Sequence, residues 1–154
     1  MTPNMLDTLY GTQIDLSNLS FRTREGFMTE YETDKPFKII VYVDSADCVP
    51  CKFPTYEVKN FVTKTLDYSS DNVAFIFIFN AGNEPVLNDF LEDYGFSLPF
   101  CIDESEFHSQ NGIPKNEQTN GLLLDENNRI IIIGNPIQNS DFQELYIRTI
   151  CERL

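Results

Sequence analysis

Two cysteines separated by two residues, Cys48 and Cys51, are the part of this sequence best suited to covalent chemistry. A pair at this spacing can close into a disulfide and open again, with a thiolate as the attacking group. The pair follows an apolar run at 37–43 that predicts a buried strand, and it precedes apolar residues at helical spacing. At the start of such a helix the dipole stabilises a Cys48 thiolate, while Cys51 lies about one turn inside and is shielded. The pattern therefore predicts a redox-active dithiol in which Cys48 attacks and Cys51 resolves.

The charges next to the dithiol act in opposite directions. Asp44 and Asp47 precede Cys48 and would raise the pKa of its thiol, whereas Lys52 follows Cys51 and would favour a thiolate nearby. An alternative interpretation is that the two cysteines form a stable disulfide or a pair of idle thiols.

The rest of the chain predicts alternating strands and helices. Strands are expected at 73–79 and 98–102, and a hairpin at 121–125 and 130–134, whose connection contains asparagines able to adopt positive φ. Helices are expected after the dithiol, at 84–94 and at the C-terminus. Pro54 would kink the first helix, the acidic cluster beginning at Asp103 would start a helical turn, and Ser140 with Gln143 would form a capping box for the last helix.

These elements predict one α/β domain with a central mixed β-sheet, flanked by helices on both faces and ending in a β-hairpin and a helix. Residues 37–154 would form this domain, and residues 1–36 an N-terminal extension that packs on it.

Composition excludes several function classes. A net charge of −13 would repel nucleic acid and anionic membrane surfaces, and we find no basic patch that would reverse this. One histidine and a single closely spaced cysteine pair do not supply the four ligands of a structural zinc site, so no metal is expected. We expect no signal peptide in this chain, because its start lacks a basic flank followed by an apolar stretch.

The sequence resembles the thioredoxin-like superfamily, and within it the bacterial envelope (TlpA-like) thiol-disulfide oxidoreductases. The resemblance rests on FKIIVYVD, on the CVPCK motif that contributes Val49, Pro50 and Lys52, and on GLLLDENNRIIIIG with its closing Gly134. It implies a thioredoxin-like fold and thiol-disulfide exchange with a protein substrate and an electron-donor dithiol protein. No cofactor is implied. The resemblance places the protein in the cell envelope or periplasm, with a membrane tether possible outside this chain.

Three positions depart from the pattern of the family. Asp47 stands where an aromatic residue usually precedes the first cysteine, and Tyr42 stands where thioredoxins bury an acid. The place of the cis-proline that contacts substrate falls on Thr119, and the nearest proline is Pro114, after Ile113. Ile113, Pro114 and Thr119 are therefore the candidates for a substrate loop.

The departures favour an alternative function, a thioredoxin-fold binding or scaffolding module with degenerate or no redox activity. A third reading, a peroxide-reducing thiol enzyme, is weaker because the Thr and Arg that activate a peroxidatic cysteine are not evident.

Three further residues have less specific interpretations. Cys101 lies in a short apolar strand and is expected to fill the core, and Cys151 near the C-terminus is expected to be incidental. His108 could act as a base near a thiol, but a solvated helix residue is the favoured interpretation.

Overall fold

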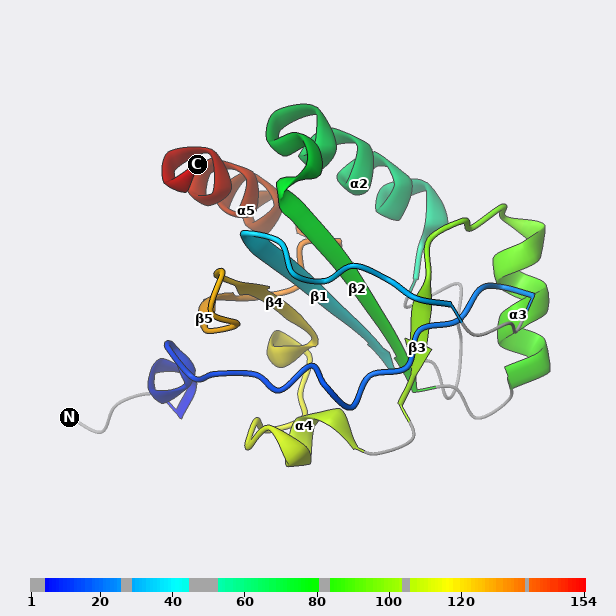
Figure 1. Ribbon diagram of the computed structural model, residues 1–154, viewed down its shortest axis with the longest axis horizontal. Coiled ribbons are helices and arrows are strands. Elements are labelled where there is room, and N and C mark those ends of the chain that lie inside the picture. The colour runs from blue at the N-terminus through cyan, green and yellow to red at the C-terminus, as the bar shows by residue number, and fades with distance from the viewer. Residues whose placement is uncertain (1–4, 26–28, 45–52, 81–83, 104–105, 138) are drawn as a thin grey trace.

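A computed structural model describes residues 5–25, 29–44, 53–80, 84–103, 106–137 and 139–154 (Figure 1). The elements follow one another in the order η1 (Met5–Leu9), β1 (Phe37–Asp44), α2 (Thr55–Ser69), η2 (Ser70–Asn72), β2 (Val73–Asn80), α3 (Glu84–Asp93), β3 (Phe100–Ile102), α4 (Phe107–Gln110), η3 (Gln118–Asn120), β4 (Gly121–Leu124), β5 (Ile130–Ile133) and α5 (Ser140–Arg153).

The five strands form one mixed sheet in the order β3-β2-β1-β4-β5. β1, β2 and β3 run parallel, β4 runs antiparallel to β1, and β5 runs antiparallel to β4. Asn128 in the β4–β5 connection has a φ of 62°, a conformation that asparagine tolerates better than most residues. The predicted mixed sheet and its C-terminal hairpin and helix are confirmed.

Helices lie on both faces of the sheet, as predicted. The side chains of α2, α3 and α5 pack on one face, and those of α4 and the N-terminal segment pack on the other (Figure 1). Successive residues of β1 alternate between the two faces, as the pleat requires, so Val41 and Val43 face α2 while Ile40 and Tyr42 face α4. Both faces of β1 are buried, which explains its nearly continuous apolar sequence.

Two predictions about helix starts are wrong. α2 begins at Thr55, so Pro54 precedes the helix instead of kinking it, and the Pro54 carbonyl accepts a hydrogen bond from the Val58 amide (3.0 Å). Proline fits this position because the first amides of a helix have no intrahelical acceptor. The N-cap of α5 is Asn139 rather than Ser140, and its Oδ1 accepts hydrogen bonds from the amides of Asp141 (2.9 Å) and Phe142 (3.3 Å).

The N-terminal segment crosses the face of the sheet that carries α4. Leu9, Ile14 and Phe21 are buried there among sheet side chains. Gln13 forms a β-bridge with Arg129 near one edge of the sheet, and Arg22 forms one with Phe100 at the opposite edge. The segment therefore covers apolar surface that the sheet would otherwise expose to water.

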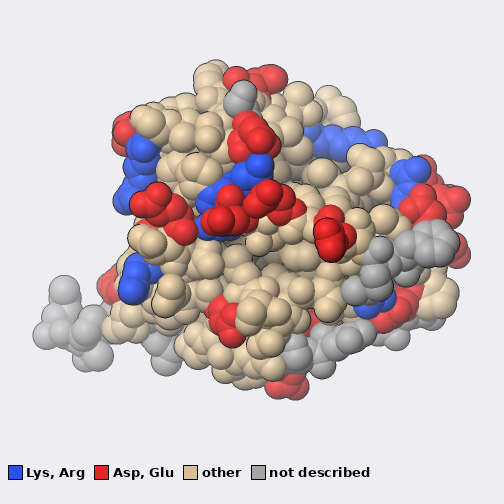
Figure 2. All heavy atoms as spheres, in the orientation of Figure 1, with Lys and Arg blue, Asp and Glu red and all other residues tan. Residues whose placement is uncertain are grey.

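Acidic side chains are spread over the face displayed in Figure 2, with basic side chains beside several of them. The described residues include an ion pair between Lys35 and Asp71 (3.0 Å). Within the described ranges, no helix is long and apolar enough to cross a membrane.

Candidate active site

The carboxyl end of β1 leads directly into the sequence-predicted dithiol. Residues 45–52, which include Cys48, Val49, Pro50, Cys51 and Lys52, lie outside the residues that the structure describes. The flanking residues are described: β1 ends at Asp44, and Phe53 is completely buried before α2 begins. The Phe53 ring packs against those of Phe77 (5.5 Å between centroids), Phe79 (5.0 Å) and Phe96 (5.4 Å).

Tyr42, the residue in place of the family's buried acid, is itself hydrogen-bonded to an acid. Its hydroxyl donates to Oδ2 of Asp103, which follows β3. Burial raises the pKa of Tyr42, and the hydrogen bond to Asp103 raises it further. Oδ1 of Asp103 accepts from the Phe107 amide (3.0 Å), so the predicted helical turn does begin with help from this carboxylate. A carboxylate thus contacts Tyr42 of β1, supplied by the residue that follows β3.

His108 is buried, and the expectation of a solvated helix residue is wrong. Its side chain is 4% exposed, and its ring meets the Tyr42 ring edge-on at 4.5 Å. Burial lowers the pKa of His108, and the positive charge of Lys115 lowers it further, while a hydrogen bond with the Thr119 backbone opposes both. Burial and the Lys115 charge therefore favour the neutral imidazole.

The three candidate substrate-loop residues lie in a connection that folds on itself. Thr119 is 1% exposed, and its Oγ1 donates to the Pro114 carbonyl (2.6 Å) and accepts from the Asn116 amide (3.2 Å). Ile113 is buried, and its amide donates to the His108 carbonyl (2.9 Å). No peptide bond in the described part of this connection is cis.

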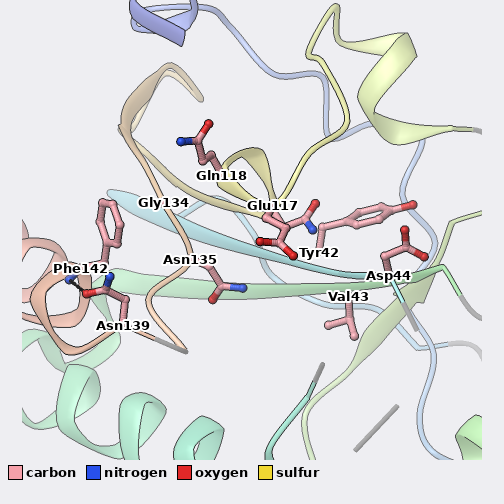
Figure 3. Close-up of a pocket in the computed structure, with 10 residues that line it drawn as sticks. Tyr42, Val43, Asp44, Glu117, Gln118, Gly134, Asn135, Asn139 and Phe142 are labelled. Carbon is pink, nitrogen blue, oxygen red and sulfur yellow. Dashed lines mark hydrogen bonds between the residues drawn. The ribbon is translucent and has the colours of Figure 1, made fainter. Parts of the chain in front are cut away.

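A cavity of about 290 Å³ lies beside the end of β1 (Figure 3). Four of its lining residues are amides: Gln118, Asn120, Asn135 and Asn139. Oδ1 of Asn135 accepts from the Ile137 amide (2.9 Å) and Oδ1 of Asn139 caps α5, so the NH₂ groups are the ends left to meet a ligand. Oδ1 of Asn120 is buried without a hydrogen-bond partner among the described residues. Donors and an acceptor of this kind suit the amides and carbonyls of an extended peptide.

A second cavity, of about 470 Å³, lies at the ends of β2 and β3. It is lined by Asn80, Asp103, Glu106, His108, Ser109, Ile113 and Lys115. Nε2 of His108 is buried and has no hydrogen-bond partner among the described residues.

The other two cysteines are free, and Cys101 is buried as predicted. Cys101 is 1% exposed in the core, where burial raises the pKa of its thiol to about 12, and Cys151 is exposed. A thiol this hard to ionise is a poor nucleophile, which agrees with a core-filling role.

The sequence did not indicate the roles of Asp103 and His108. Tyr42 and Asp103 are 61 positions apart, and no local pattern indicates a contact at that distance along the chain. The signal that could have suggested the contact is the hydroxyl of Tyr42 in an apolar strand, together with an acid, Asp103, directly after another strand.

No family model matches the sequence, and no curated protein matches it. Solved structures do match. The peroxidoxin BcpB from Mycobacterium tuberculosis is 10% identical with a TM-score of 0.65, over 92% of this chain and 97% of that one. A bacterioferritin comigratory protein from Xanthomonas campestris is 11% identical with a TM-score of 0.62, over 94% and 98%.

A thiol-disulfide oxidoreductase from Bacteroides fragilis is 15% identical with a TM-score of 0.54, over 82% of this chain and 95% of that one. The TM-scores show a shared overall fold, although most residues of these proteins differ from those of this chain. The chain therefore has a thioredoxin-like fold.

Proposed function

We propose that the protein is a thiol-disulfide oxidoreductase in which Cys48 is the nucleophile and Cys51 the resolving thiol. The observation that carries the proposal is the place of the motif along the chain. Residues 45–52 connect the carboxyl end of β1, the central strand, to the buried Phe53 that precedes α2. The motif precedes α2 in the chain, and a thiolate near a helix N-terminus is stabilised by the helix dipole. A similar fold occurs in a protein named as a thiol-disulfide oxidoreductase.

The exchange takes two steps. The Cys48 thiolate attacks one sulfur of a partner disulfide, the partner's S–S bond breaks, and the other partner sulfur leaves as a thiolate that takes up a proton. The Cys51 thiolate then attacks Cys48 and releases the second partner thiol. The partner gains two electrons and the Cys48–Cys51 pair becomes a disulfide, which a second dithiol protein reduces again by the reverse steps.

The amide-lined cavity is the proposed place for the backbone of the substrate protein. It adjoins Asp44 at the end of β1, and it includes Asn120, the residue after Thr119. The hydrogen bonds from Thr119 to the Pro114 carbonyl and from Asn116 to Thr119 would hold this loop in place without a cis-proline.

The test is a pair of serine substitutions. With Cys51→Ser, the mixed disulfide on Cys48 has no neighbouring thiol to resolve it and should accumulate, whereas Cys48→Ser should trap none at the motif. Each reduced variant is mixed with oxidised glutathione and with a disulfide-bonded peptide, and adducts are located by non-reducing peptide mass mapping. Cys101 supplies an internal control, because its buried thiol should stay unmodified. If Cys51→Ser forms no Cys48 adduct and both variants unfold more easily than the parent, the binding-module function replaces this proposal.

Peroxide reduction is a second candidate, favoured by the similarity to a protein whose alkyl peroxide reduction has been studied. In that reaction Cys48 would take one oxygen from the peroxide to give a sulfenic acid and an alcohol, and Cys51 would condense with it, releasing water. Trapping of a sulfenic acid on Cys48 in Cys51→Ser after cumene hydroperoxide treatment, faster than on the free thiol of a cysteine peptide, would support this candidate.

A further inference from the structure

The second cavity contains an unused hydrogen-bond acceptor. His108 lines this cavity and bonds to the Thr119 backbone through one ring nitrogen, while Nε2 is buried and has no partner in the described part of the chain. In a neutral imidazole whose other nitrogen carries the proton, Nε2 is an acceptor. Burying an acceptor without a donor costs free energy, so the site lacks a group that donates a hydrogen bond.

The charges around this cavity leave an excess of negative charge. Lys115 is the positive group, and its Nζ lies 4.0 Å from Asp44 and 5.5 Å from the centre of the Tyr42 ring. Asp44 therefore offsets Lys115. The carboxylates of Asp103 and Glu106 remain, and neither has a described ion pair.

The carboxylates of Asp103 and Glu106 differ in the hydrogen bonds that they already accept. Both oxygens of Asp103 accept hydrogen bonds, from the Tyr42 hydroxyl and the Phe107 amide. Among the described residues, Glu106 accepts a side-chain hydrogen bond only from the Ser109 hydroxyl, on Oε2 (3.2 Å), and it is exposed at the cavity edge. Glu106 also has a φ of 55°, a backbone conformation that a glutamate rarely adopts. It is therefore the carboxylate with capacity for a ligand.

We propose that this cavity binds a small organic ammonium ion, whose N–H groups donate to Nε2 of His108 and whose charge faces Glu106. Its volume of about 470 Å³ suits a small molecule. An anion would meet two carboxylates, and a neutral polyol would leave their charge uncompensated. A metal ion fits less well, since no three His, Cys, Asp or Glu side chains converge as ligands anywhere in the described ranges. The proposal is separate from the exchange reaction and holds whether or not the dithiol is active.

The single histidine of the chain makes the test direct. The imidazole ¹⁵N resonances of the intact protein are followed while ethylammonium chloride is added at constant ionic strength and pH. The Nε2 resonance should move saturably, with a Kd on the order of 1 mM or weaker for so small a probe. Sodium acetate and glycerol, added in the same way, should leave it in place.

Charge-matched variants complete the test. Glu106→Gln should weaken ethylammonium binding about two- to fivefold, the range of one partly exposed charge pair. Glu144→Gln, at an exposed position of α5, removes the same charge away from the cavity and should leave the affinity unchanged. The proposal is overturned by a linear or absent response to ethylammonium, by an equal response to acetate or glycerol, or by equal weakening in both variants.

Discussion

His108 illustrates how a single residue takes its properties from contacts that are remote in sequence. Its helix, α4, has only four residues, too few for a periodic pattern to tell a buried position from an exposed one. The side chain is buried because the Tyr42 ring and the Thr119 backbone lie beside it. The burial of Cys101 could be predicted from sequence, because both of its neighbours in the strand are apolar.

The lowered pKa of His108 predicts a pH dependence of stability. The unfolded chain binds a proton at this residue near its ordinary pKa of 6.5, whereas the folded chain binds it only at lower pH. The unfolded state therefore holds more protons in that interval, and the contribution of His108 to stability is complete above 6.5 and is lost as the pH falls through the folded pKa.

Two measurements check this dependence. The NMR titration of the imidazole in the folded protein should give a pKa below 6.5. Urea unfolding at about pH 7.5 and about pH 5 should show the parent losing more free energy of unfolding than His108→Gln, which cannot titrate there. An equal loss in both proteins, or a folded pKa above the ordinary value, would contradict the prediction.

At the scale of elements, the sequence predicts type and order well and helix starts less well. The strands and the hairpin follow from apolar runs with turn residues between them, and these signals are local. The predicted N-cap of α5, Ser140, is one residue too late. Asn139 and Ser140 are both good N-caps, and only the backbone conformation decides between them. Asn139 has the extended φ and ψ of a cap (−141° and 113°), while Ser140 is already helical.

Substitutions at Asn139 and Ser140 test which of the two residues caps α5. Asn139→Ala removes an acceptor for two amides of α5 and should lower the free energy of unfolding by about 1 kcal/mol. Ser140→Ala, at an exposed position inside the helix, should change it by less than about 0.5 kcal/mol. Chemical denaturation measures both changes. A larger loss of free energy of unfolding in Ser140→Ala than in Asn139→Ala would show that Ser140 caps the helix, as the sequence suggests.

At the scale of the whole molecule, the sheet divides the apolar interior into two layers that are covered differently. Three helices cover one face, and their apolar sides could be recognised from sequence. On the other face, α4 is joined by the irregular segment that contains Leu9, Ile14 and Phe21. The sequence of that segment alternates only weakly, around 13–19, and so short a stretch could not show which of its residues touch the sheet.

This arrangement predicts that the N-terminal segment is part of the cooperative fold. Ile14 is 1% exposed, and its amide donates to the Asn128 carbonyl (2.8 Å) in the β4–β5 connection. Ile14→Ala would leave a cavity against the sheet and should lower the free energy of unfolding by about 2–5 kcal/mol, as at a central core position. Tyr10→Ala, four residues earlier and 50% exposed, should cost less than about 0.5 kcal/mol.

The shape of the unfolding transition distinguishes an integral segment from one that only rests on the surface. If the segment unfolds with the sheet, far-ultraviolet circular dichroism and tyrosine fluorescence should give one coincident transition in both variants, shifted to lower urea in Ile14→Ala without a change in slope. A segment that detaches on its own would instead give Ile14→Ala an unchanged main transition and an early exposure of apolar surface to a dye. The first outcome follows from the two β-bridges that hold the segment, at Gln13–Arg129 and at Arg22–Phe100, because neither can break without loosening the hairpin connection or the start of β3.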